Sequence, residues 1–348
     1  MADWRLPFEA RVRWVGVDPA TWKETGPVGG VLSGGKVVLD AGDPVKASAS
    51  VDVTGDFSPT GLVRCYADVS FSDGSRAAEC LGTFGATVPR WSRTDAGASG
   101  AADLYGCLSL AQGAVPAVSV HVPAGSDPVA AAAGCLRAAG LSVSADTGPQ
   151  RLAEARTYGL VPVDGVGDDR LAIARDLCAA AGFKEPVCDP MGRALLRRQL
   201  DDASRAPDQR WEEGPGCRFL PSMEDEEEEP KATCVKVVAS TGRGSVVAQA
   251  RDDAASERLG REVWEVVRPS EEMDLDRAQA LADKTLRERL AARRTVSLKH
   301  IYRPVALGDV VDLSWPTGKV RGRFRVERVS VDLGAPGLLM DVDLEEVR

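Results

Sequence analysis

The feature that most constrains this chain is a period of two in its apolar residues, which recurs in several separate stretches. The clearest case runs from Val45 to Val53, where valine and alanine occupy every second position and the residues between them are polar. Successive side chains of a strand point to opposite faces of a sheet, so this pattern predicts half-buried strands in antiparallel sheets. The 35 Gly and 21 Pro residues favour many short connections between such strands.

The N-terminal part of the chain is predicted to be all β. Strands are expected at Phe8–Trp14, Val37–Leu39, Val45–Val53, Leu62–Ser70 and Arg76–Val88. Ser72-Asp73-Gly74 separates the last two, and Asp-Gly between two strands indicates a hairpin. Short connections make these strands antiparallel, which predicts a barrel or a sandwich. The Ser-, Gly- and Ala-rich stretch Arg90–Gly100 is interpreted as a linker.

The middle of the chain changes to helical patterns. Asp127 is a candidate N-cap with Pro128 at the first helical position, and this helix is expected to end at Gly140. Asp168 or Asp169 is expected to cap a second helix, Leu171–Ala181, which ends before Gly182. Short strand-like stretches follow both helices, so the region is predicted to be α/β.

The C-terminal part returns to strands. The stretch Trp211–Glu229 is predicted to be irregular, and its six consecutive acidic residues, Glu224–Glu229, are expected to form an exposed, mobile loop because like charges repel. Three strands are then expected at Thr233–Ser240, Ser245–Arg251 and Val263–Val267.

An amphipathic helix and three more strands complete the chain. The helix is predicted over 274–295, because apolar residues recur every three or four positions from Leu275 to Leu290. The strands are expected at Val311–Trp315, Phe324–Leu333 and Met340–Leu344. Phe324 and Val326 share one phase of the middle strand, whereas Val329, Val331 and Leu333 take the other. This change of phase predicts a β-bulge at Glu327-Arg328.

Charge and cysteine content limit the classes of function. The net charge of −9 argues against a protein that grips nucleic acid or an anionic membrane through clustered Lys and Arg. No long apolar window predicts a membrane span, and Met1–Arg5 does not open a signal peptide. Eight Cys lie mainly in apolar phases and form no C-x-x-C pair, so buried free thiols and a reducing compartment are expected. They are Cys65, Cys80, Cys107, Cys135, Cys178, Cys188, Cys217 and Cys234.

Two glycine-rich motifs are weak candidates for nucleotide sites. The stretch Gly30–Val37 mimics a phosphate-binding loop, but Val37 replaces the Ser or Thr that would hold magnesium, and Lys36 enters a predicted strand. The stretch Gly165–Arg170 lacks the third glycine of a dinucleotide fingerprint, and its two acids would repel a pyrophosphate. Both motifs are therefore interpreted as structural, and no cofactor is predicted.

Catalytic and metal-binding residues are not predicted at any position. The two histidines, His121 and His300, are far apart and have no cluster of ligands around them, and His300 is expected to be buried or interfacial. A G-x-S-x-G motif is absent from the sequence. A paired-carboxylate site or a Cys–His pair stays open as an alternative, although nothing in the sequence marks one.

Three stretches resemble the tail-tip hub proteins of long-tailed bacteriophages, which are often called minor tail proteins. The first is the strand end Cys80–Pro89, with its Leu-Gly-Thr-Phe sequence. The second is the helix Leu171–Phe183 followed by Cys188–Arg193. The third is the helix segment Ala278–Asp283 that leads to Val305–Val311 with its Leu-Gly-Asp. The order of these stretches along the chain carries the resemblance.

The resemblance implies a β-rich α+β fold with two antiparallel β-barrels like those of tail-tube proteins and an α/β insert between them. The expected divisions are an N-terminal barrel at 1–93, the insert at 94–215, an acidic linker at 216–232 and a second barrel at 233–348, which includes the helix 274–295. Three subunits would form a ring that joins a six-fold tail tube to a three-fold tip and lets DNA pass through its lumen.

The resemblance also implies a location and partners. The chain would lie at the tail tip of a virion assembled in the host cytoplasm, in contact with the distal tail protein, the tape measure protein and tip or fibre proteins. It would have no enzymatic activity and no sequence-specific contact with nucleic acid. Two alternatives stay open, a tail-associated cell-wall hydrolase and a receptor- or carbohydrate-binding tail protein.

Overall fold

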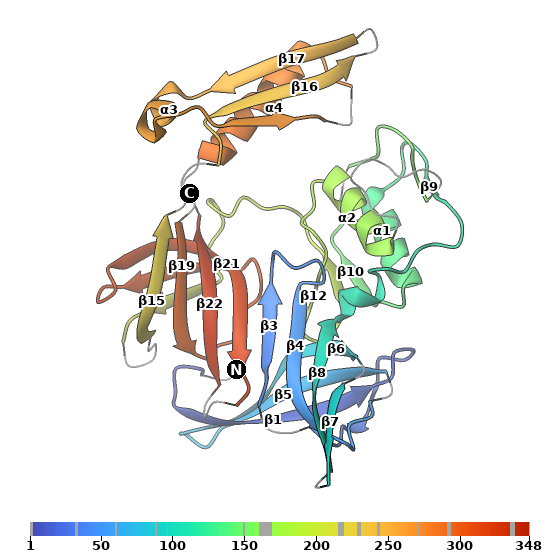
Figure 1. The fold of residues 1–348 in the computed structure, drawn as a ribbon, viewed down its shortest axis with the longest axis vertical. Coiled ribbons are helices and arrows are strands. Elements are labelled where there is room, and N and C mark those ends of the chain that lie inside the picture. The colour runs from blue at the N-terminus through green and yellow to red at the C-terminus, as the bar shows by residue number, and fades with distance from the viewer. Residues whose placement is uncertain are drawn as a thin grey trace. The chain divides into compact units, whose positions relative to one another are not determined.

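The computed structural model describes residues 3–347 except 32–33, 60, 88, 96, 149, 160–168, 215–218, 228–230, 242–243, 270–271, 291–293 and 335–337. The chain divides into two compact units (Figure 1). The first combines Met1–Met223 with Ser297–Arg348, and the second is Glu224–Val296. The second unit is therefore an insertion in the sequence of the first. The four-part division at 93, 215 and 232 stays a prediction.

The N-terminal strand set contains the five strands that the alternation predicts, together with three more. They are β1 (Phe8–Val17), β2 (Glu24–Pro27), β3 (Lys36–Asp40), β4 (Ala47–Thr54), β5 (Leu62–Phe71), β6 (Arg76–Ala86), β7 (Arg90–Thr94) and β8 (Gly97–Gly106). The hairpin between β5 and β6 is confirmed, because Ser70 pairs with Arg76 and Gly74 has a φ of 86°. The end of the predicted last strand, Val88, lies outside the described residues.

The linker predicted over Arg90–Gly100 is wrong. Strands β7 and β8 pair in antiparallel register across this stretch, from Arg90↔Ala101 to Thr94↔Gly97. The prediction failed because most side chains of β7 are exposed, so no buried face imposes an apolar alternation there.

The N-terminal strands pair in the order β3-β4-β8-β6-β5-β1-β2, and all of these pairs are antiparallel. The chain that follows β2 returns to β4, where an isolated bridge joins Val31 to Val53. Beside this bridge, the Thr54 amide donates to the Gly30 carbonyl over 2.7 Å. A backbone contact therefore links the two sides of this set.

The insert follows β8, and its described residues form two α-helices, one short 3-10 helix and five short strands. Its elements are η1 (Cys107–Leu110), β9 (Val120–Val122), α1 (Pro128–Ala138), β10 (Val143–Ala145), β11 (Arg156–Tyr158), α2 (Arg170–Ala180), β12 (Val187–Cys188) and β13 (Ala194–Leu196). Both helices begin as the sequence predicts. Asp127 accepts from the amides of Val129 and Ala130, and Asp169 accepts from the amide of Ala172.

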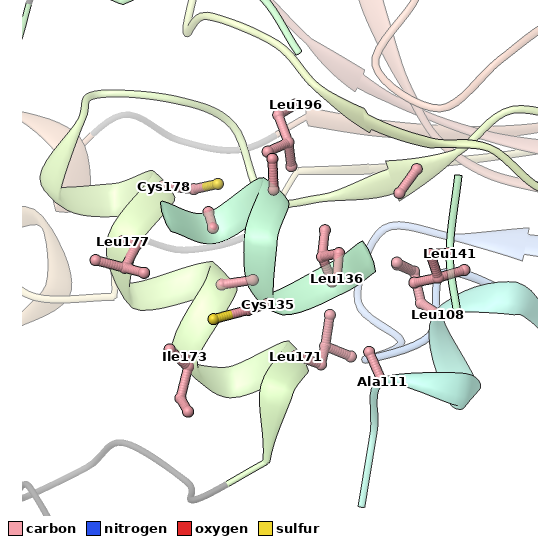
Figure 2. Packing of buried hydrophobic residues seen from close by; sticks show 14 of the residues in the cluster. Leu108, Ala111, Cys135, Leu136, Leu141, Leu171, Ile173, Leu177, Cys178 and Leu196 are labelled. Atoms are coloured by element: carbon pink, nitrogen blue, oxygen red, sulfur yellow. The ribbon is translucent and has the colours of Figure 1, made fainter. Parts of the chain in front are cut away.

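The two helices of the insert also end as predicted, at Gly140 and Gly182, which have φ values of 89° and 67°. Helices α1 and α2 pack on each other through small and aliphatic side chains, among them Cys135, Leu136 and Leu177 (Figure 2). Leu108 and Ala111, at and just after η1, belong to the same cluster (Figure 2). The insert is therefore anchored to the end of β8 by its own core.

The C-terminal strand set has six strands, of which three follow the predicted alternation. It consists of β14 (Gln209–Glu212), β15 (Phe219–Glu227), β19 (Arg294–Ile301), β20 (Val310–Trp315), β21 (Val320–Asp332) and β22 (Leu339–Glu346). Their order is β14-β20-β21-β22-β19-β15, in which β14 and β20 are parallel. Strands β14, β15 and β19 were not predicted. The irregular stretch expected over Trp211–Glu229 is thus wrong where β14 and β15 form.

The predicted β-bulge is confirmed in β21. Val326 pairs with Leu344 and Arg328 pairs with Asp343, so Glu327 has no partner in β22. On its other side, β21 pairs with β20 up to Arg325 and with β3 from Arg328 onward. The Glu327 carbonyl accepts from the Ala41 amide at this change of neighbour. The bulge therefore lies where one strand passes from the C-terminal set to the N-terminal set.

The acidic run is only partly as predicted. Residues Glu224 to Glu227 form the end of β15 rather than a loop, which corrects the prediction for this part. The side chains of Glu224, Asp225 and Glu226 are exposed, as expected. Strand β15 tolerates these acids because β19 pairs with it and places Arg294 2.8 Å from Asp225. Glu228 and Glu229 lie outside the described residues.

The second unit is a three-stranded sheet with a helix on one face. Its elements are β16 (Cys234–Thr241), β17 (Gly244–Arg251), α3 (Asp253–Leu259), β18 (Trp264–Val267) and α4 (Leu275–Leu290). Helix α4 packs Ala278, Ala282 and Leu286 against Val235 and Val237 of β16. The helix was predicted to run to 295, but residues 294 and 295 belong to β19. The β-rich α+β class is confirmed.

Candidate functional site

The main candidate site is a cavity of about 500 Å³ within the first unit. Three parts of the unit line it: the N-terminal strands, the insert and the segment 305–309 before β20. Its apolar wall includes Leu39, Leu81, Phe84, Val187, Leu195, Leu200, Val305 and Leu307. A cavity at the meeting point of three parts is a common place for a ligand or a partner side chain.

One side of the cavity carries a buried lysine that joins the N-terminal set to the insert. Lys46 follows the turn after β3 and has a left-handed φ of 62°. Its Nζ lies 2.6 Å from the Glu185 carboxylate, which Arg175 of α2 also contacts at 3.1 Å. Burial would raise the pKa of Glu185, but Lys46 and Arg175 together lower it below its usual value. Glu185 therefore stays charged at neutral pH.

A buried carboxylate joins the insert to the C-terminal strands. The side chain of Asp202 is only 7% exposed and is surrounded by three cations. Arg205 lies 2.9 Å from it, Arg325 of β21 lies 3.4 Å away, and Lys184 lies 3.7 Å away. Removing one member of such a group is costly, because the remaining charges stay buried without compensation. This group therefore fixes the segment after the insert against β21.

A buried arginine holds the opposite end of the insert. Arg64 of β5 is 3% exposed, and its Nε donates to Thr83 Oγ1 over 2.9 Å. The two other guanidinium nitrogens donate to Glu24 Oε1 and to the Met191 carbonyl. Thr83 Oγ1 in turn donates to the Pro190 carbonyl over 2.8 Å. These hydrogen bonds hold the turn 189–193 of the insert against β5 and β6.

The thiols around the cavity are poorly suited to nucleophilic chemistry. Burial raises the pKa of Cys107 to about 12 and that of Cys80 to about 11, and it raises the pKa of Cys188 well above its ordinary value. A reactive cysteine needs the opposite shift. Asp309, which also lines the cavity, has its pKa raised by burial. The Asp309 carboxylate accepts from the Ala306 amide over 2.9 Å, which fixes the turn before β20.

The Cys–His alternative left open by the sequence has a candidate place in the insert. His121 of β9 and Cys135 of α1 line one shallow pocket of the insert. The His121 Nδ1 lies 2.8 Å from Thr157 Oγ1, and burial raises the pKa of Cys135. A His-activated thiol would have a lowered pKa and a bond to the imidazole. The pair therefore lacks both marks of an active nucleophile.

His300 lies in an aromatic cluster of the C-terminal set, as the expected buried imidazole. Its ring stacks on Trp211 of β14 at 5.6 Å, and Phe219 of β15 meets it edge-on at 5.3 Å. Phe219 also stacks on Trp315 of β20 at 5.0 Å. Burial lowers the pKa of His300 to about 4, so the ring is neutral at pH 7. The cluster joins β14 and β20 to β15 and β19 across the set.

Neither glycine motif forms a nucleotide site in the part that the structure describes. Lys36 begins strand β3, so it does not lead into a helix N-terminus. Of the second motif, residues 165–168 lie outside the described residues, whereas Asp169 caps α2. Among the described residues, no group of three or more His, Cys, Asp or Glu side chains has an arrangement that could hold a metal. No helix described here has the length and apolarity that crossing a bilayer requires.

Sequence reasoning missed the residues that hold the three parts together. Arg64 offered one signal, because it is a charged residue inside the apolar run Leu62–Cys65. The sequence gives no signal for Asp202 or Lys46. Each lies in a polar connection and is buried only because a residue far away in the sequence, Arg325 or Glu185, packs against it.

Comparison with solved structures identifies the fold. A tail protein from Neisseria meningitidis MC58 is similar over 97% of this chain and 96% of its own length, with a TM-score of 0.68 and 15% sequence identity. This chain has the fold of phage tail proteins. The resemblance to phage tail proteins that the sequence suggested is therefore confirmed for the fold.

Two further structures extend the comparison. The 43 kDa tail protein of prophage MuSo2 from Shewanella oneidensis has a TM-score of 0.63 at 10% identity, over 97% of this chain and 98% of that one. A Francisella PdpA–VgrG complex matches 98% of this chain and 58% of the chain compared, with a TM-score of 0.58 at 8% identity. No family model matches the sequence, and no curated protein matches it.

Proposed function

We propose that this chain is a structural hub protein at the distal end of a phage tail, where three copies form a ring between the six-fold tail tube and the tip. The observation that carries the proposal is the similarity to a tail protein over almost the whole of both chains. Tail proteins work through their interfaces. In the cavity of the first unit, Lys46 is paired with Glu185 and burial raises the pKa of Cys107, so neither is suited to catalysis. The proposed role is non-enzymatic.

Two strand sets support the proposal of two tube-like barrels. The main path of strand pairing in the large sheet runs from β15 to β2, with β7, β14 and β20 branching from it, so closure of each proposed barrel would depend on other contacts. In the N-terminal set, the bridge between Val31 and Val53 links opposite sides. In the C-terminal set, the stack of Phe219 on Trp315 does the same through side chains. Three subunits with two such barrels each would match six-fold symmetry.

The net charge supports the proposed passage of DNA. A lumen lined by Lys and Arg would hold the phosphate backbone, whereas an acidic or neutral surface lets it slide. The chain has 52 acidic and 43 basic residues, so its net charge is negative, as expected for a surface that does not hold DNA. The proposed partners are neighbouring tail proteins: the distal tail protein, the tape measure protein and tip or fibre proteins. The proposed place of assembly is the host cytoplasm.

The proposal is tested by the mass and shape of the purified protein. Mass photometry is expected to give a species of three chains, and negative-stain electron microscopy is expected to show rings with a central opening. Antibody labelling of virions is expected at the tail tip. A protein that stays monomeric at every concentration and is missing from virions contradicts the proposal.

A further inference from the structure

The sheet of the second unit has one uncovered face. Residues that pair across strands lie on the same face, so Val247 lies beside Val238, and Gln249 and Val266 flank Lys236. Helix α4 packs on the opposite face, through Val235 and Val237. On the uncovered face, Val247 is 47% exposed, Val266 46% and Trp264 42%. We name this surface, made by Lys236, Val238, Val247, Trp264 and Val266, the open face.

The charge of the open face is unusual for this acidic chain. The strand residues on this face include Lys236 and Arg251 but no carboxylate. Arg251 is neutralised by Asp253 and Glu262, at 2.9 and 2.5 Å. Lys236 sits on the central strand among apolar neighbours, and no carboxylate of a described residue pairs with it. The open face therefore presents one uncompensated cation within an apolar surface.

A surface of complementary charge lies at the acidic end of β15. Side chains alternate along β15, so Glu224 and Glu226 point to one side and Asp225 to the other. Arg294 binds Asp225 through two nitrogens, at 2.9 and 2.8 Å. Glu224 and Glu226 are exposed, and no described cation pairs with either. Two carboxylates are therefore available for a cation from outside the chain.

We propose that the open face of one copy docks on the acidic end of β15 in a second copy, with Lys236 against Glu224 and Glu226 of the partner subunit. The contact joins two different surfaces, so it is head-to-tail, and a rotation of one third of a turn between copies would close three such contacts into a ring. The apolar residues around Lys236 would exclude water and strengthen the ion pair. This inference rests on the proposed trimer and names one of its interfaces.

The test uses charge reversal in the full chain. K236E is expected to raise the trimer dissociation constant at least about tenfold, because it places an acid against two acids. E226K is expected to do the same by placing two cations together. The double variant K236E/E226K pairs the introduced acid with the introduced cation, although Glu224 still faces that acid, so its dissociation constant is expected to fall between those of the single variants and the wild type. Mass photometry over a concentration series measures all three.

A matched pair of apolar substitutions tests the rest of the open face. V266K is expected to dissociate the trimer, because it buries a charge in the contact. V118K makes the same change at an exposed valine of the insert and is expected to leave the trimer intact. Circular dichroism and thermal unfolding of each variant verify that it folds.

The outcomes separate this inference from the proposed function. A wild-type trimer that both K236E and V266K leave unchanged overturns the inference and keeps the trimer. Failure of the double variant to recover, while both single variants dissociate, overturns the pairing of Lys236 with Glu226. A wild-type protein that never associates overturns the proposed trimer itself and the inference with it.

Discussion

The N-terminal and C-terminal strand sets bring their opposite sides together in different ways. The N-terminal set uses main-chain groups, with the Val31–Val53 bridge and the bond from Thr54 to the Gly30 carbonyl. The C-terminal set uses stacked rings, with Trp211 on His300 and Phe219 on Trp315. A main-chain contact depends on backbone conformation, whereas a stack depends on particular side chains. The two sets should therefore respond to different substitutions.

The largest effect is expected from removing a ring of the C-terminal set. Trp211 is fully buried, so Trp211→Ala should lower the free energy of unfolding by about 3–5 kcal/mol through lost burial and a new cavity. Trp91→Ala, at a partly exposed tryptophan of β7, is the control and should cost far less. Denaturant unfolding of both variants measures the difference. Equal losses for the two would contradict the idea that the stack holds the C-terminal set together.

The histidine of the same cluster predicts a pH dependence. The folded-state pKa of His300 is about 4, below its ordinary 6.5, so the unfolded chain binds the proton more readily. The stabilisation is complete above pH 6.5 and is lost as the pH falls towards 4, by about 3 kcal/mol in total. His300→Gln should flatten this part of the stability profile. Identical slopes for wild type and His300→Gln between pH 6.5 and 4 would refute the assignment.

A backbone substitution should affect the N-terminal set. Gly30 has a φ of 75°, and an added Cβ would lie 2.4 Å from the Phe57 nitrogen. Gly30→Ala should therefore cost about 2 kcal/mol or more, from the strained backbone and the clash. Gly113→Ala is the control, because its φ is 72° but nothing lies within 4 Å of the added atom. Thermal unfolding should rank the two, and a larger loss at Gly113 would show that the clash does not matter.

The smallest effect is expected from a surface pair of the N-terminal set. Arg13 and Asp68 join β1 to β5 at 2.8 Å, but both side chains are more than two-fifths exposed. Asp68→Asn should therefore change the free energy of unfolding by only about 0.5 kcal/mol. The same substitution at the buried Asp202, which serves the C-terminal strands, should cost about 3 kcal/mol. Urea unfolding distinguishes these values, and comparable losses would contradict the contrast between exposed and buried pairs.

Alternation along single strands predicted much of the fold, and pairing over long distances explains what it missed. The strands around Val51, Val69 and Val331 have one buried face, so their apolar residues repeat with period two. Strand β19 has the same signal in Val296, Leu298 and His300, but the helix predicted over 274–295 was extended into its start. Strand β15 carries acids that only the pairing with β19 makes acceptable. No local pattern shows that β15 and β19 pair, because the strands and helices of the second unit separate them in the sequence.

The candidate site was less predictable than the fold. The helix caps at Asp127 and Asp169 are local, and their signals are visible in the sequence. In contrast, Lys46 meets Glu185, and Asp202 meets Arg325, only after distant segments have packed together. The bulge at Glu327 is intermediate, because the change of phase is local although its neighbour β3 is not.

The pairing of β3 with β21 has a consequence for synthesis on the ribosome. Strand β3 is made long before residues Arg328–Asp332, which complete its outer edge. A nascent or truncated chain therefore presents an unsatisfied edge of β3, which other chains or chaperones are able to bind. Only a chain that extends through Asp332 covers this edge. A chain that stops before Arg328 therefore keeps this edge of β3 exposed.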